Sequence, residues 1–135
     1  MFVAWHLEML NGLCSSSESR VAEIAAKAVK EVQYHVERSG ETVIGLGDGT
    51  DESHARIQAA LDHMWPYVGE MFTPDAVDEE MMSKGVIPDL AALRSTFDAR
   101  VGAVMAEATL TIPARILVTK AAKAAFSTRN ILGIS

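Results

Sequence analysis

A long amphipathic stretch begins near Glu18 to Arg20 and continues to about Gly45. At about 100° per residue, six of its apolar residues fall on one stripe of a helix, and most of the charged residues fall on the other side. The six are Val21, Ile24, Ala25, Ala28, Val32 and Val36. This pattern predicts a helix that buries one side against other helices, because a half-buried strand would alternate with a period of two.

The sequence also predicts helices before and after this stretch, with a loop between the first two. "MFVAWHLEML" is apolar and amphipathic from its first residue and has no capping residue, so we expect Met1 to lie inside a helix whose earlier part is missing. "NGLCSSSESR" predicts a loop. Thr50 is expected to cap a helix from Asp51 to Phe72, which Pro66 should kink or split near Trp65.

Two more helices are expected towards the end of the chain. "TPDAVDEEMMSKG" places Thr73 as the capping residue and Pro74 at the first helical position of a short acidic helix that closes at Gly85. Helical periodicity restarts near Pro88 and continues to about Glu107. No strand-like alternation of useful length occurs, so the sequence predicts an all-α bundle with short loops between antiparallel neighbours.

Composition limits the possible classes of function. A chain of 135 residues is enough for one domain, and its net charge of −6 argues against nucleic acid as a partner. Cys14 is the single cysteine, which favours a reducing compartment. No apolar run approaches the roughly 20 residues of a membrane helix, and no signal peptide is recognisable. We therefore expect a cytoplasmic location.

One pair of residues on the long helix could carry chemistry. Glu31 and His35 lie one helical turn apart, at the edge of the apolar stripe, so both are expected to face a neighbouring helix. Di-iron carboxylate proteins use glutamate and histidine three residues apart, together with glutamates from other helices. Here the spacing is four. We interpret the pair as hydrogen-bonded at a helix interface, with metal ligation as the alternative, and expect His35→Ala to cost about 1–3 kcal/mol.

Other candidates favour structural roles. Asp51 and His54 have the three-residue offset but begin a helix beside a glycine-rich turn, where solvent is expected to reach them. "GLGDG" lacks both the spacing of a phosphate-binding loop and a preceding strand, so a turn between helices is the better interpretation. His6, Trp5 and Trp65 read as packing residues, and the indole N–H groups need partners.

Four segments of this chain resemble one protein family. They are "AAKAVKEVQYH" (25–35), "LGDGTDESH" (46–54), "MWPYVGEMF" (64–72) and "EATLTIP" (107–113). Over a collinear region from Phe2 to about Pro113, the chain is similar to the PaaC family, whose members are components of phenylacetyl-CoA epoxidases, also called phenylacetate-CoA oxygenases.

The resemblance implies a ferritin-like helical bundle and a place in a multicomponent oxygenase. In that family, PaaC pairs with PaaA, which holds the di-iron centre and the phenylacetyl-CoA site, and a reductase with NADPH, FAD and iron–sulfur supplies electrons for ring epoxidation. PaaC itself is regarded as structural, so the resemblance implies no catalytic residue and no cofactor in this chain. Glu31 and His35 would then be remnants of a lost metal site. Partners would be PaaA, other epoxidase subunits and possible homodimer contacts.

Two departures from the family pattern divide the chain. Family members carry two long helices before the point that matches Phe2, so residues 1–115 are expected to form a partial ferritin-like domain. Residues 116–135 diverge from the family ending, and their codons overlap, one base out of register, with those for its glycine-rich histidine–glutamate segment. We expect a frameshifted tail.

Two alternative functions remain open from the sequence. One is a di-iron-binding oxidoreductase in its own right, with Glu31 and His35 as ligands and Glu107 as a further carboxylate. The other is a free-standing helical interaction protein.

Overall fold

The computed structural model describes residues 1–113, which fold entirely into helices and connecting loops. The helices are α1 (Phe2–Leu13), α2 (Ser19–Gly47), α3 (Asp51–Met64), the 3₁₀-helix η1 (Trp65–Phe72), α4 (Ala76–Ser83) and α5 (Leu90–Glu107). The described range contains no strand, which confirms the all-α prediction. None of these helices is long and apolar enough to cross a membrane. The expected boundary at residue 115 and the frameshifted tail lie outside the described residues.

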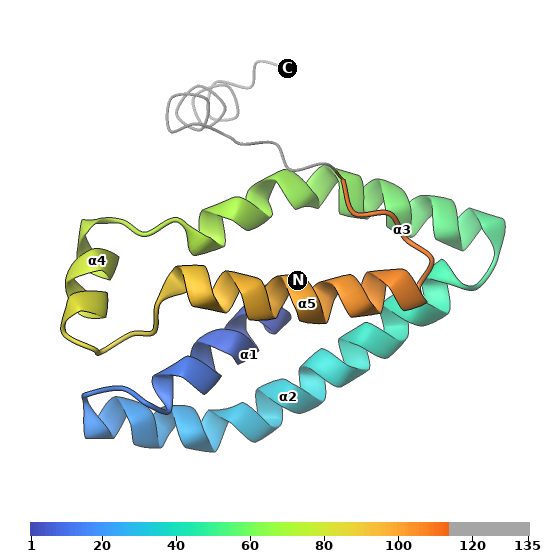
Figure 1. Cartoon of the computed structure of the whole chain (residues 1–135). Coiled ribbons are helices and arrows are strands. Elements are labelled where there is room, and N and C mark those ends of the chain that lie inside the picture. The colour runs from blue at the N-terminus through green and yellow to red at the C-terminus, as the bar shows by residue number, and fades with distance from the viewer. Residues whose placement is uncertain (114–135) are drawn as a thin grey trace, which may run out of the picture.

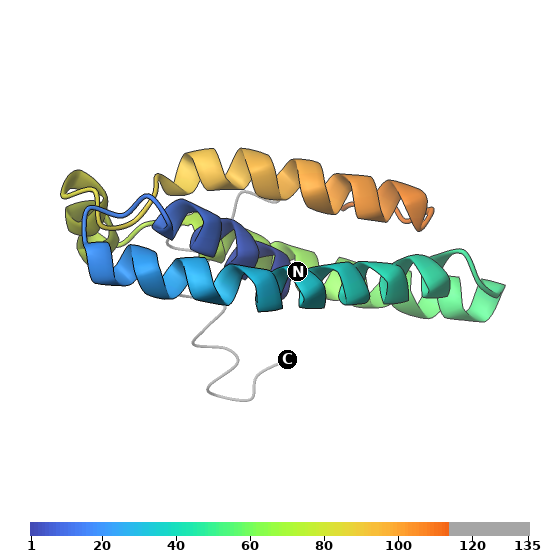
Figure 2. The ribbon, with the colours of Figure 1, turned by 90° about the horizontal axis from the view of Figure 1, so that it is seen from below.

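The helices form two layers. α2 and the α3–η1 unit diverge from the turn at residues 48–50, and α5 runs between them (Figure 1). Seen after a 90° turn, α5 forms a layer of its own on one side of α2 and α3, with α1 between α5 and α2 (Figure 2). α4 lies at the end away from the α2–α3 turn (Figure 1). α5 therefore covers one side of the layer formed by α1, α2 and α3.

Apolar side chains fill the space between the layers. On α5, the buried residues Phe97, Val101 and Met105 repeat at intervals of four, which places them on one side of the helix. They pack with Leu61 of α3 and with further buried residues, which include Ala4, Trp65, Val68, Ala108 and Leu110. Each of these apolar side chains is removed from water, and this burial stabilises the arrangement.

Aromatic side chains join the elements at the centre of the molecule. The Trp5 indole N–H donates a hydrogen bond of 3.1 Å to the carbonyl of Met71, so α1 is tied to η1. The Phe72 ring lies 5.0 Å from the ring of Phe97, which is fully buried. The prediction that Trp5 packs and finds a partner for its N–H is confirmed, and Trp65 is likewise buried.

Both ends of α3 agree with the sequence prediction. The Thr50 side chain accepts a hydrogen bond from the backbone N–H of Ser53, and the backbone N–H of Thr50 donates in return to the Ser53 hydroxyl, which forms the predicted cap of α3. The helix changes to 3₁₀ geometry at Trp65, immediately before Pro66, as expected from the missing N–H of proline.

Two predicted boundaries are wrong. α4 is capped by Asp75 rather than Thr73, because the Asp75 carboxylate accepts from the N–H of Asp78 in a reciprocal box. α1 continues through Asn11 and Gly12, which the loop prediction excluded, and ends at Leu13. A Cβ on Gly12 would lie 2.5 Å from Pro88 Cγ, so glycine is required there by the close approach of the loop before α5.

The predicted apolar stripe of α2 is displaced from the buried side. Ala25 is almost fully buried and Val21, Ala28, Val32 and Val36 are half-buried, as expected. Ile24 is 61% exposed, so its assignment to the core is wrong. The buried side of α2 is centred on the small side chain of Ala25, about 100° around the helix from Ile24.

Candidate functional site

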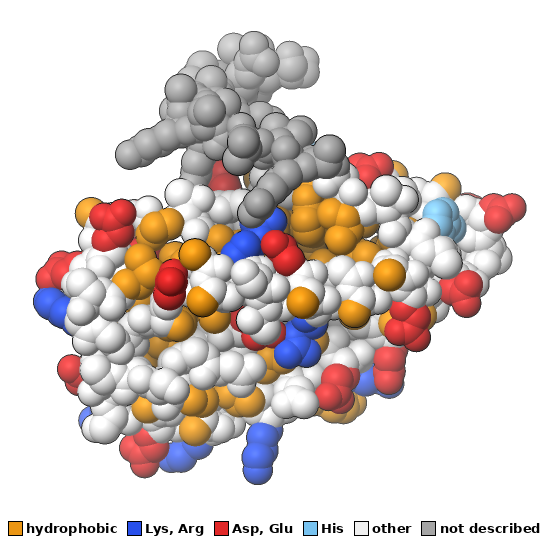
Figure 3. All heavy atoms as spheres, in the orientation of Figure 1, with side chains coloured by type: hydrophobic (Ala, Val, Ile, Leu, Met, Phe, Trp, Pro, Cys, Tyr) orange, Lys and Arg blue, Asp and Glu red, His pale blue; other side chains and the backbone are white. Residues whose placement is uncertain are grey.

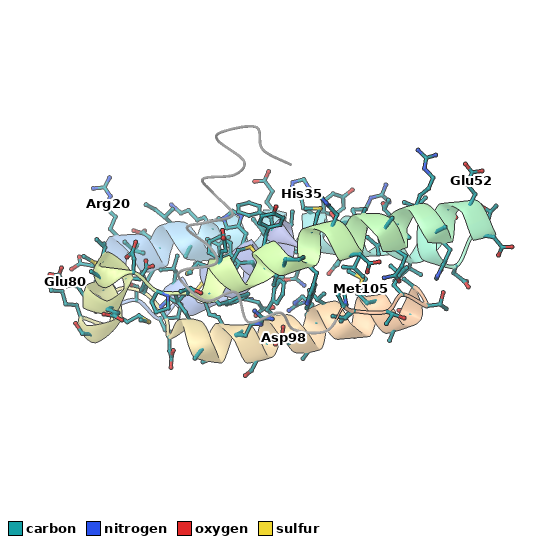
Figure 4. All side chains as sticks on the ribbon, turned by 90° about the horizontal axis from the view of Figure 1, so that it is seen from above. Arg20, His35, Glu52, Glu80, Asp98 and Met105 are labelled. Carbon is teal, nitrogen blue, oxygen red and sulfur yellow. The ribbon has the colours of Figure 1, made fainter. Side chains whose placement is uncertain are left out.

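Glu31 and His35 lie side by side on α2, but they are not buried at a helix interface. The His35 Nε2 atom is 3.8 Å from Glu31 Oε1, and the His35 and Glu31 side chains are 57% and 81% exposed, respectively. Figure 4 shows His35 on the side of the molecule away from Asp98 and Met105 of α5. The prediction of an inward-facing pair is therefore wrong for the described part of the chain. The reason is the same displacement of the buried side from Ile24 to Ala25.

This pair belongs to a longer exposed line of side chains, which we call the α2 stripe. Its members follow one another mostly at intervals of three and four, so they share one side of the helix. They are Ile24, Lys27, Glu31, His35, Arg38 and Leu46, and all of them are exposed. The α2 stripe combines two large apolar side chains with two basic side chains, one histidine and one carboxylate.

A shallow hollow lies beside the end of the α2 stripe. It has a volume of about 270 Å³ and is lined by Leu46 of α2 and by Ser53, Arg56 and Ile57 of α3. Arg56 extends into solvent and lies 3.9 Å from Glu52 in an exposed ion pair. The hollow can accommodate an apolar side chain, but the lining has no buried polar group that would select a small ligand.

The described residues do not form a metal-ligating cluster. Within residues 1–113, no three side chains among histidine, cysteine, aspartate and glutamate come close enough to hold one metal ion. Glu31 and His35 would thus need further ligands from outside this range. Glu107, the third suggested ligand, lies exposed at the end of α5.

A buried ion pair that the sequence did not reveal joins α1 to α5. Glu8 is 4% exposed, and its Oε1 atom accepts a hydrogen bond of 2.6 Å from Arg100 Nε. A carboxylate taken out of water requires such a partner. Glu8 is the acidic residue in the mostly apolar run "MFVAWHLEML", a position that indicates a buried carboxylate in need of a partner. Arg100 could not be identified as this partner from the sequence, because it lies 92 residues after Glu8.

His54 has a structural role rather than the solvated position that we predicted. Its Nδ1 atom lies 2.8 Å from the carbonyl oxygen of Gly47, at the last turn of α2. The Thr109 hydroxyl lies 3.4 Å from the same carbonyl. These contacts hold the end of α2, the start of α3 and the segment after α5 together, whereas Asp51 is exposed. The glycine-rich segment before Thr50 contains the last residues of α2, which ends at Gly47 rather than at about Gly45, and the turn to α3 that the sequence predicts follows at residues 48–50.

The remaining candidates give no site. Cys14 is free and exposed at the end of α1. His6 is half-buried with its ring 5.8 Å from that of Phe2, which agrees with a packing role.

Comparison with known proteins identifies the class. The model of the phenylacetic acid catabolic protein family (PaaA/PaaC) matches residues 1–129, and the chain belongs to this family. Its all-α architecture agrees with the ferritin-like fold that the resemblance implies.

Within the family, the chain is similar to the C component of 1,2-phenylacetyl-CoA epoxidase from Escherichia coli strain K12. The two are 36% identical over 110 residues, which cover 82% of this chain and 44% of that protein. The chain thus spans less than half the length of this curated relative.

Proposed function

We propose that this chain acts in aerobic phenylacetate catabolism as a structural, non-catalytic subunit of a phenylacetyl-CoA epoxidase assembly. In this role it docks and stabilises a catalytic subunit of the PaaA kind. The observation that carries the proposal is the similarity to the C component of the Escherichia coli epoxidase over 82% of the chain.

The α2 stripe supports a docking role. Ile24 and Leu46 are large apolar side chains on an exposed helix side, where a partner could remove them from water. Glu31 and His35 have the four-residue spacing rather than the three-residue spacing of di-iron ligands, and both extend outward. We assign the pair to this surface rather than to a reaction centre.

The assembly would hold its cofactors elsewhere. We propose that the di-iron centre belongs to the PaaA partner, and that NADPH, FAD and iron–sulfur belong to the reductase subunit. We also propose a cytoplasmic location for the complex, where the single Cys14 would remain reduced.

Co-purification tests the proposal directly. The full chain carrying an affinity tag is co-expressed with a PaaA subunit, and we expect both in one peak on size-exclusion chromatography. A tagged chain that elutes without PaaA at micromolar concentrations would disprove the docking role.

Iron analysis separates this proposal from a metal-binding oxidoreductase. We expect no stoichiometric iron in the purified chain alone, and no difference between the parent chain and the Glu31→Ala/His35→Ala double variant. Stoichiometric iron that the double variant loses would favour the oxidoreductase instead.

A further inference from the structure

We propose that residues 108–112, which we call the strap, detach from the helices as a unit, and that the side chain of Gln58 is the latch that holds the strap closed. The strap follows the end of α5 and crosses to α3 (Figure 1). The proposal describes a conformational device of this fold. It goes beyond the proposed function, because it depends on contacts within this chain alone.

The strap covers one end of the apolar interior. Ala108 and Leu110 are buried and Ile112 packs half-buried against the same core, whereas Thr109 and Thr111 are exposed. This alternation is typical of an extended chain, which turns every second side chain inward. Apolar side chains gather between α3 and α5 beside the place where the strap crosses (Figure 3). A detached strap would open this end of the interior to water.

Gln58 of α3 binds the backbone of the strap rather than a side chain. Its Nε2 atom donates a hydrogen bond of 2.8 Å to the carbonyl oxygen of Thr111, and its Oε1 atom accepts one of 2.9 Å from the Thr111 N–H. One side-chain amide therefore satisfies both backbone groups that a neighbouring strand would satisfy in a sheet. Within residues 1–113, these are the shortest polar contacts between α3 and the strap.

Thr109 makes the closed strap strained. The N–H of Thr109 donates to the carbonyl of Ala106 and the N–H of Leu110 donates to that of Met105, so α5 ends in a Schellman motif. Glycine usually occupies the left-handed position of this motif. Thr109 occupies it here with a φ of 60°, the one positive φ of a non-glycine residue within residues 1–113. A side chain branched at Cβ disfavours this conformation.

Contacts with α2 compensate for part of this strain. The Thr109 hydroxyl donates a long hydrogen bond of 3.4 Å to the carbonyl oxygen of Gly47, which also lies 2.8 Å from His54 Nδ1. A strained residue held by a weak side-chain contact relaxes when its surroundings loosen. The strap should thus be less stable than the helices beneath it, and the two bonds from Gln58 should decide how often it opens.

Amide hydrogen exchange on the full chain tests whether the strap opens by itself. The amide of Leu110 is the reporter, because its bond to Met105 is lost when Thr109 leaves the left-handed conformation. The amides of Phe97 and Val101 report opening of α5 itself. We expect the exchange of Leu110, relative to an unfolded chain, to be at least about tenfold less protected than that of Phe97 and Val101.

Matched glutamine variants test the latch. Gln58→Ala should accelerate exchange at Leu110 at least about tenfold and leave Phe97 and Val101 unchanged, because two hydrogen bonds to the strap are lost. Leu110 does not bond to Gln58, so its rate reports the strap rather than a missing acceptor. Gln33 of α2 also bonds to a carboxylate four residues later, as Gln58 does to Asp62. The control Gln33→Ala should change exchange at Leu110 less than about twofold.

A third variant tests the assigned strain. Asparagine accepts the left-handed conformation more readily than threonine and keeps a polar side chain. Thr109→Asn should therefore slow exchange at Leu110 about threefold or more. Circular dichroism checks that each variant keeps its helices.

Each part of the proposal can be overturned separately. Equal protection of Leu110, Phe97 and Val101 in the parent chain would show that the strap and α5 open together. An unchanged rate at Leu110 in Gln58→Ala, or a rise shared equally with Phe97 and Val101, would overturn the latch. Faster exchange at Leu110 in Thr109→Asn would overturn the role of strain. These measurements involve no PaaA subunit, so their failure is distinct from failure of the proposed function.

Discussion

The two sides of α2 differ in how closely other helices approach them. One side buries Ala25 and brings Gly40 and Gly47 close to Val104 and Ala108 of the α5 region. The other side is the α2 stripe, which leaves Ile24 and Leu46 in solvent. The two fully buried residues of α2 are the small Ala25 and Gly47, whereas the larger Val43 and Ile44 are only partly buried against the core. The fully buried positions of α2 are thus those where a neighbouring helix approaches most closely.

Shortening a large side chain should change the free energy of unfolding far more in the interior than on the α2 stripe. Phe97→Ala should lower the free energy of unfolding by about 3–5 kcal/mol, because it leaves a cavity beside Phe72. Ile24→Ala should change it by less than about 0.5 kcal/mol. Urea unfolding of the full chain measures both. Similar losses for the two variants would mean that the stripe is buried in solution.

The second test compares a buried ion pair, Glu8 with Arg100, with an exposed one, Glu80 with Lys84. Arg100→Ala should cost about 2–3 kcal/mol, because the carboxylate of Glu8 stays buried without its guanidinium partner. Lys84→Ala breaks the exposed pair with Glu80 and should cost less than about 1 kcal/mol. The same unfolding experiment applies. A loss for Arg100→Ala no larger than that for Lys84→Ala would show that Glu8 is hydrated.

The third test compares two glycines of α2 that lie two residues apart. A Cβ on Gly47 would collide with the Ala108 carbonyl oxygen and lie 2.9 Å from Ala108 Cβ, so Gly47→Ala should destabilise by about 1–3 kcal/mol. Gly45 has no neighbouring atom within 4 Å. Gly45→Ala should stabilise the helix by about 0.5–1 kcal/mol. Thermal melts followed by circular dichroism would show opposite shifts. Equal shifts would contradict the close approach of Ala108 to α2 at Gly47.

The smallest effect is expected for the pair that first suggested a site. From the sequence, His35→Ala is expected to lower the free energy of unfolding by about 1–3 kcal/mol. Because Glu31 and His35 are exposed, we now expect this substitution to change it by less than about 0.5 kcal/mol. The measurement is the midpoint of urea unfolding at neutral pH. A loss above about 1 kcal/mol would restore the buried interpretation.

Local sequence rules predicted several elements of this fold correctly. The capping residue Thr50, the change of helix geometry before Pro66 and the length of α2 all follow from interactions within a few residues. The boundary at Asp75 was missed because Thr73 and Asp75 are both good capping residues, and the reciprocal bond with Asp78 favours the second.

The candidate site was predicted less well, because its surroundings depend on distant segments. Periodicity within the sequence predicts a set of amphipathic helices, with a glutamate and a histidine one turn apart on the longest of them. Packing between helices that are distant in sequence buries Ala25 rather than Ile24, pairs Arg100 with Glu8, and leaves Glu31 and His35 in solvent. Helical periodicity fixes which residues share a side, whereas the closeness of packing between helices decides which side is buried.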